Sequence, residues 1–107
     1  MKTETYELQG QVFEWDRCKH LSNIKKHGVT FKTAAKAFFD PNAEMFDDEE
    51  HSQHEERFVL IGMDECEQVL TVCHCYRGES ESITRIISAR KATSIEEELY
   101  GGVFYEQ

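Results

Sequence analysis

Three apolar runs in the second half of the chain constrain its fold more than any other feature. They span Phe58–Met63, Val69–Tyr76 and Ile83–Ala89, and all are rich in β-branched and aromatic residues. Short polar segments separate them at residues 64–67 and 77–81. Such residues favour strands, and strands joined by short turns pair antiparallel. We therefore expect an antiparallel meander.

Two further segments extend the strand pattern. A short strand is expected over Ala43–Phe46, followed by an acidic loop over Asp47–Glu56. Residues 6–15 alternate loosely between apolar and polar side chains, which predicts a first strand near the start of the chain.

A helix is expected between these strand patterns, directly after Asp16. Aspartate is a favoured N-cap residue, and Gly28 has the position of a C-terminal glycine cap. Cys18, Leu21 and Ile24 recur every three residues and predict a narrow buried stripe on this helix.

A second helix is predicted from about Phe31. Phe31, Ala34, Ala35 and Phe38 fall at positions i, i+3, i+4 and i+7, and Asp40-Pro41 ends the pattern. Both helices need to bury their apolar stripes, and covering one face of the sheet achieves this.

The last helical signal lies near the C-terminal end. Ser94-Ile95-Glu96-Glu97 has a capping-box pattern, so a short helix is expected over Ile95–Tyr100. The expected fold class is α+β: two N-terminal helices packed on an antiparallel meander, with a short C-terminal helix.

Length and composition favour one domain over residues 1–107. A chain of 107 residues has room for one hydrophobic core, and a single proline and six glycines leave no linker. Its 39% hydrophobic content is too high for a disordered tail. No apolar run approaches the ~18 residues that a membrane span requires, and no signal-peptide pattern opens the chain. We expect a cytoplasmic protein with no membrane contact.

The charges are unevenly distributed. The net charge of −9 argues against a general nucleic-acid coat protein. Residues 16–36 nevertheless sum to +5 and residues 68–93 to +2, whereas residues 37–67 sum to −10. This asymmetry suggests an anionic ligand; solvated helix and strand faces are the alternative.

Metal or cofactor binding is not expected from the cysteines and histidines. The four cysteines are Cys18, Cys66, Cys73 and Cys75. They lack zinc spacing and are expected to be reduced. His74 would point away from its two cysteine neighbours in a strand, so the three side chains do not converge. His51 and His54 lie among carboxylates in what is expected to be a solvated loop.

A set of cations remains as the candidate site, because no glycine-rich phosphate loop, nucleophile elbow or helical zinc motif is present. These cations are Lys19, Lys26, His27, Arg57, Arg77, Arg85 and Arg90. Arginine binds phosphate oxygens bidentately, and lysine or histidine exchanges protons. Such a cluster suits a phosphodiester. RNA cleavage then requires no metal, because the ribose 2′-OH is an internal nucleophile.

Four of these cations also have a purely structural interpretation. Lys26 and His27 complement a helix C-terminus, and the stem of Arg85 packs along the sheet. Arg57 pairs locally with Glu55 or Glu56 in that interpretation.

Several strings resemble the BrnT-type toxins. In the N-terminal half they are Phe13-Glu14-Trp15-Asp16, Lys26-His27-Gly28-Val29 and Asp40-Pro41. In the C-terminal half they are Glu56-Arg57, Arg77-Gly78 and the run RIISARKAT over residues 85–93. The resemblance extends from about Phe13 to Tyr100.

This resemblance implies a function, a fold and partners. BrnT-type proteins are the toxin halves of bacterial type II toxin–antitoxin pairs, with a fold related to RelE-type ribonucleases. They are metal-independent endoribonucleases that stop translation by degrading RNA. A ribbon-helix-helix antitoxin of the BrnA type neutralises them, and the complex represses its operon, so operator DNA is contacted through the antitoxin. Two toxins and two antitoxins are the expected assembly.

The resemblance also implies roles for individual residues. The expected catalytic residues are Lys26, His27, Glu56, Arg57, Arg77 and Arg85. Lys26 or His27 would transfer a proton, and the arginines would hold the phosphate. Glu56 would act as a base or orient an arginine. The expected further RNA contacts are Lys19, Arg90 and Lys91.

The last predicted helix departs from the family pattern. Family members often follow the Ala-Thr dipeptide with a strongly basic helix, whereas Ser94–Tyr100 contains three glutamates and no lysine or arginine. An acidic face weakens attraction to RNA. Either the other cations bind the RNA, or the chain is a weak or inactive homologue that acts as a protein-binding module or co-repressor with its antitoxin.

Overall fold

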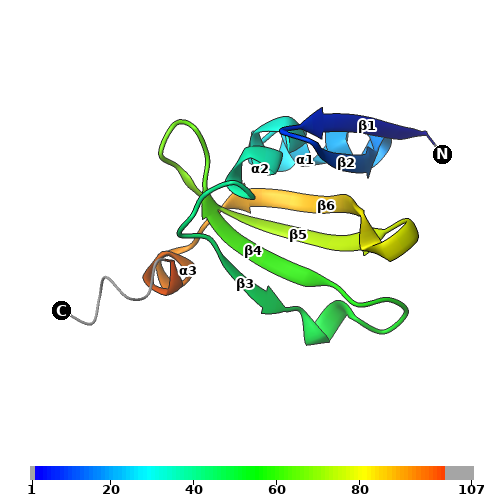
Figure 1. Ribbon diagram of the computed structural model, residues 1–107. Helices are drawn as coiled ribbons and strands as arrows, with labels where there is room; N and C mark the ends of the chain where they lie inside the picture. Colours follow the sequence, from blue (N-terminus) through cyan, green and yellow to red (C-terminus); the bar gives the residue numbers. More distant parts are fainter. Residues whose placement is uncertain (1, 101–107) are drawn as a thin grey trace.

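The computed structural model describes residues 2–100, whose strands form one six-stranded sheet in the order β1-β2-β6-β5-β4-β3 (Figure 1). The strands are β1 Thr3–Leu8, β2 Gln11–Asp16, β3 Glu44–Asp47, β4 Phe58–Met63, β5 Val69–Arg77 and β6 Ile83–Lys91. Neighbouring strands are antiparallel except β2 and β6, which are parallel.

The meander β3–β6 has the predicted order and direction. Strand β4 has the predicted bounds, while β5 and β6 continue to Arg77 and Lys91, past their predicted ends. Short 3-10 helices, η1 Glu49–His51 and η2 Glu79–Glu81, interrupt the acidic loop and the β5–β6 turn.

The N-terminal part of the sheet differs from the prediction. Instead of one strand over residues 6–15, β1 and β2 form a hairpin around Gln9 and Gly10. Both turn residues have positive φ, 50° and 82°, as tight two-residue hairpin turns require. The hairpin joins the sheet through the parallel pairing of β2 with β6, so the sheet is mixed rather than purely antiparallel. The long connection that parallel neighbours need is provided by the helices and the meander.

Helices α1 Arg17–His27 and α2 Phe31–Ala37 follow the hairpin and pack on the sheet. Helix α2 buries Phe31, Ala34 and Ala35, the predicted stripe. It fits closely against β4, because a Cβ added at Gly62 would lie 2.7 Å from the carbonyl oxygen of Ala37.

The predicted buried stripe of α1 is wrong. Leu21 is 56% exposed and Ile24 is 37% exposed, and Cys18 is also exposed. The side of α1 that faces the sheet instead carries Asn23, which is 5% exposed. The spacing of apolar residues does not reveal that a polar residue is the one that docks the helix.

The Asn23 amide connects three backbone segments. Its Nδ2 donates to the carbonyl oxygens of Val29, at 2.9 Å, and Ala89, at 2.8 Å. Its Oδ1 accepts from the backbone N–H of Ala89 at 3.0 Å. These bonds join α1 to β6 and to the connection that leads into α2. The predicted caps of α1 are confirmed: Asp16 accepts from the N–H of Cys18, and Gly28 has a φ of 70°.

Helix α3 Ser94–Leu99 begins one residue earlier than predicted, because the capping box is formed by Thr93 and Glu96. Glu96 also accepts from Arg90 at 2.6 and 2.8 Å and from the hydroxyl of Thr71 at 2.9 Å. One carboxylate therefore attaches the helix to β5 and β6. No helix within residues 2–100 is long and apolar enough to cross a membrane.

Candidate active site

Strand alternation places several of the predicted site residues on the sheet face opposite the buried core. His74 and Ile86 point into the core, so their neighbours Cys75 and Arg85 point the other way. Cys75 is paired with Arg85 across β5 and β6, and Arg85 with Glu14 across β6 and β2. The cations meet where β5 ends and β6 begins, at the right-hand side of Figure 1.

A pocket of about 230 Å³ lies at this position. Its lining is Asp16, Lys19, Glu55, Arg57, Cys75, Arg77, Arg85 and Ile87. The residues come from the β2–α1 junction, the end of the acidic loop, β5 and β6. Four cations face two carboxylates in this lining, so the pocket carries a net charge of +2 when all six are ionised.

Two of these arginines are paired with carboxylates. Arg77 donates from Nε and Nη2 to the two oxygens of Glu55, at 3.1 and 3.0 Å. This hydrogen-bonded pair lowers the pKa of Glu55 and raises the pKa of Arg77. Arg85 donates from Nη1 to Glu14 at 2.6 Å.

Arg57 differs from its two neighbours. Its Nε is buried and has no hydrogen-bond partner among residues 2–100. A buried donor without an acceptor is costly, and such exceptions are uncommon in folded proteins. The pocket therefore combines one unsatisfied guanidinium nitrogen with two arginines that carboxylates already hold in position.

The structure brings together Lys19, Arg57, Arg77 and Arg85 and places the other predicted residues elsewhere. Lys26 and His27 lie exposed at the other end of α1, about 10 Å along the helix from Lys19 at 1.5 Å per residue.

The remaining three predicted residues also lie outside the pocket. Glu56 is exposed and lines a neighbouring hollow with Glu55, Tyr76 and Glu81. Arg90 is bound by Glu96, and the exposed Lys91 lies near Glu97 at the far end of β6.

Sequence reasoning missed Glu55 as a pocket residue. The acidic loop bends at residues 53–55, and tertiary packing brings the Glu55 carboxylate to Arg77. The sequence alone does not distinguish Glu55 from Glu56. The sequence indicates Asp16 only as a helix cap and Cys75 only as a reduced thiol, because their position in the pocket depends on tertiary packing.

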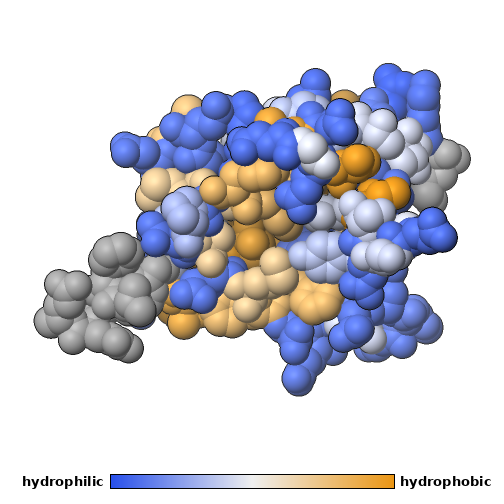
Figure 2. Space-filling view, in the orientation of Figure 1, coloured by the Kyte–Doolittle hydropathy of each residue, from blue (hydrophilic) through white to orange (hydrophobic). Residues whose placement is uncertain are grey.

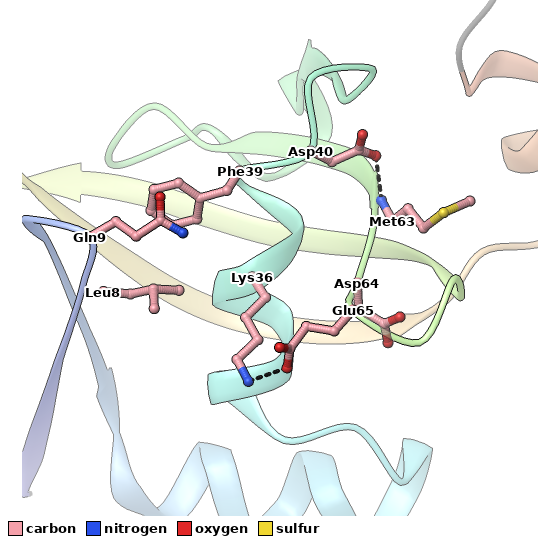
Figure 3. A pocket seen from close by; sticks show the side chains of 8 residues that line it. All are labelled: Leu8, Gln9, Lys36, Phe39, Asp40, Met63, Asp64 and Glu65. Atoms are coloured by element: carbon pink, nitrogen blue, oxygen red, sulfur yellow. Dashed lines mark hydrogen bonds and ion pairs between the residues drawn. The ribbon is translucent and has the colours of Figure 1, made fainter.

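A larger cavity of about 340 Å³ lies at another part of the molecule, between the β1–β2 turn, α2 and the β4–β5 turn (Figure 3). Lys36 faces it but is paired with Glu65. Asp40 accepts from the N–H of Met63 at 2.7 Å and from the hydroxyl of Tyr100 at 2.6 Å. With Asp64 also in its lining, this cavity has more carboxylates than cations and does not suit a phosphate.

The comparison with protein families decides which kind of protein carries this pocket. A family model described as the ribonuclease toxin BrnT of type II toxin–antitoxin systems matches residues 15–96. The chain belongs to the BrnT family. The matched segment contains all four cations of the pocket, and the predicted family is confirmed.

A solved structure also resembles this BrnT chain. It is the 1.1 Å crystal structure of the Brucella abortus ribonuclease toxin BrnT, with a TM-score of 0.56 and 24% sequence identity. The match covers 75% of this chain and 94% of the Brucella chain. At this identity the likeness shows a shared α+β fold. No curated protein matches the chain in sequence.

Proposed function

We propose that this BrnT-family chain is an endoribonuclease toxin of a bacterial type II toxin–antitoxin pair. It folds as a single toxin domain over residues 1–107, with a fold related to RelE-type ribonucleases. In the cytoplasm it cleaves RNA without a metal and thereby stops translation. The observation that carries the proposal is the pocket in which Lys19, Arg57, Arg77 and Arg85 converge.

The residue types in the pocket suit cleavage of a phosphodiester. Guanidinium groups hold the non-bridging phosphate oxygens and stabilise the charge that develops when the 2′-oxygen attacks phosphorus. Arg57 lines the pocket, and Arg77 and Arg85 are pre-positioned beside it by carboxylates. The proton-transfer role expected of Lys26 or His27 is not retained in this proposal, because both lie outside the pocket. With Lys91, they are proposed to contact RNA beyond the cleaved linkage.

One observation favours a different function. Carboxylates already neutralise Arg77 and Arg85, and α3 carries three glutamates, which reduces the attraction for a polyanion. A chain of this kind would act as a catalytically weak homologue that binds its antitoxin as a co-repressor. The two functions differ in whether the purified protein cleaves RNA.

The partner we propose is a ribbon-helix-helix antitoxin of the BrnA type, in an assembly of two toxins and two antitoxins. Operator DNA would be bound through the antitoxin. Figure 2 shows an apolar area across the middle of one face, bordered by hydrophilic surface. Met45 and Phe46 of β3 are 46% and 38% exposed and adjoin the acidic segment 47–56. A basic antitoxin segment with apolar side chains would complement this edge.

The test is an RNA cleavage assay with the purified chain in EDTA. Arg77→Ala and Arg85→Ala are each expected to reduce the rate on the order of 10²–10³-fold, because each removes a donor to the transition state. Lys25→Ala, on the exposed part of α1, is the matched control and should keep its rate. If the folded wild-type chain cleaves no RNA, the co-repressor function is supported instead. If it cleaves RNA and both arginine variants do so equally well, the pocket is not the active site.

A further inference from the structure

We propose that Glu55 is the proton acceptor for the attacking 2′-OH, and that Arg77 holds it in position until a phosphate group takes the place of Glu55 on the guanidinium. This inference rests on the proposed ribonuclease function. It assigns a catalytic role to a residue that the family resemblance did not indicate.

Glu55 is the pocket carboxylate that binds a side chain rather than capping the backbone. The lining contains two carboxylates, Asp16 and Glu55. Asp16 is 6% exposed and caps α1 by accepting from the N–H of Cys18 at 2.9 Å. Glu55 is bound by the side chain of Arg77, and about a third of its side chain is open to solvent. A ligand in the pocket therefore has access to Glu55.

Several charged groups surround Glu55. Arg77 is bonded to it, Arg57 attracts it and Cys75 lies beside it; Lys19, Arg85 and Asp16 line the same pocket. The bond to Arg77 lowers the pKa of the Glu55 carboxyl, so it is ionised and able to accept a proton at neutral pH.

A bound phosphate would change how Glu55 and Arg77 are paired. Its oxygens compete with Glu55 for the donors of Arg77, and the carboxylate that loses those donors becomes a stronger base. Substrate binding would thus increase the basicity of Glu55 at the moment when a base is needed. Arg57 lines the same pocket and places a second guanidinium charge beside the phosphate.

The proposed step conserves atoms and charge. A Glu55 oxygen takes the proton of the 2′-OH while the 2′-oxygen forms a bond to phosphorus. The bond between phosphorus and the 5′-oxygen breaks, and that oxygen takes a proton from water. The products are a 2′,3′-cyclic phosphate end and a 5′-hydroxyl end. Glu55 then returns its proton to the solvent.

Glu56 provides a matched control, because it is the same residue type at the adjacent position. It is exposed and does not line the pocket. Glu55→Gln and Glu56→Gln remove the same charge from the same loop. A difference between them therefore reports the position of the carboxylate rather than the total charge of the protein.

The experiment measures kcat, KM and the pH–rate profile of the full chain on a synthetic RNA oligonucleotide. We expect Glu55→Gln to lower kcat on the order of 10²-fold while KM changes less than threefold. The acidic limb of the kcat/KM profile should disappear in this variant. Glu56→Gln should behave as the wild type, and Glu55→Asp should restore part of the rate together with the acidic limb.

Two results distinguish a failure of the proposed role of Glu55 from a failure of the proposed ribonuclease function. A Glu55→Gln variant with the rate and acidic limb of Glu56→Gln would overturn the role of Glu55 and leave the ribonuclease function in place. An inactive wild-type chain would overturn both. Glu55→Ser, checked by thermal unfolding, is the second variant in case Gln at this position disturbs the loop, and it should show the same loss.

Discussion

His74 should make the protein less stable as the pH falls below neutrality. Its ring is fully buried, with the ring of Phe38 at 4.8 Å and that of Tyr76 at 5.2 Å between centroids. Nδ1 lies 3.3 Å from the carbonyl oxygen of Val72, and Nε2 lies 3.2 Å from the hydroxyl of Tyr76. No carboxylate appears among these contacts to balance a positive charge, and burial lowers the pKa of His74 from 6.5 to about 4.

The direction of the effect follows from which state binds the proton. Between pH 6.5 and about 4, the unfolded chain protonates His74 and the folded chain does not. The stability is therefore complete above pH 6.5 and is lost as the pH falls toward 4. A tenfold difference in proton affinity is worth about 1.4 kcal/mol, which gives a loss of about 2.5 kcal/mol between pH 7.5 and 4.5.

Urea denaturation at pH 7.5, 6.5, 5.5 and 4.5 measures this loss. His74→Phe keeps an apolar ring in the site and should flatten the pH dependence in that window. His54→Gln, in the exposed acidic loop, removes a histidine without changing the core and should keep the wild-type slope. Carboxyl groups with a lowered pKa, such as Glu96 with a pKa of about 2, affect the free energy of unfolding below pH 4.5. Equal slopes for the wild type and His74→Phe would refute the reasoning.

Two other contacts give stability predictions of their own. Asn23→Ala removes three buried hydrogen bonds and leaves backbone groups of Ala89 without partners. Urea denaturation should therefore show that the free energy of unfolding falls by about 2–4 kcal/mol. The control Ser22→Ala, at an exposed position, should change it by less than about 0.5 kcal/mol. Glu96→Gln removes the charge that Arg90 binds and should cost about 1–3 kcal/mol at pH 7. Because the pKa of Glu96 is lowered from 4.5 to about 2, the wild-type advantage should be present above pH 4.5 and disappear as the pH falls toward 2; a constant difference down to pH 2 would contradict this.

Local signals predicted much of the fold. The meander, the caps of α1 and the buried stripe of α2 depend on residue types at fixed spacing, and the structure has them. The exposed stripe of α1 is a case in which residue spacing predicted the wrong buried face. Leu21 and Ile24 have helical spacing, but the helix docks through Asn23 because backbone groups at the junction with β6 need hydrogen-bond partners.

In the candidate site, too, the sequence predicted the residue types but not all of their positions. Residue types predicted a phosphate-binding cluster, and the pocket contains four of the cations that the sequence indicated. The sequence did not indicate that Lys26 and His27 would lie at the distant end of α1, or that Arg90 would be bound by Glu96. These outcomes depend on the distances between helices and strands in the folded protein. The spacing of residues along the chain does not give those distances.

The amino-acid sequence by itself determined the family, the order of the helices and of the meander strands, and the kinds of side chain available for chemistry, because these depend on local patterns. Only the tertiary structure decided that β2 lies parallel to β6 and that Glu55, rather than Glu56, faces the arginines. Both depend on which strand faces meet across long stretches of chain, and there packing and the pairing of charges outweigh local preference.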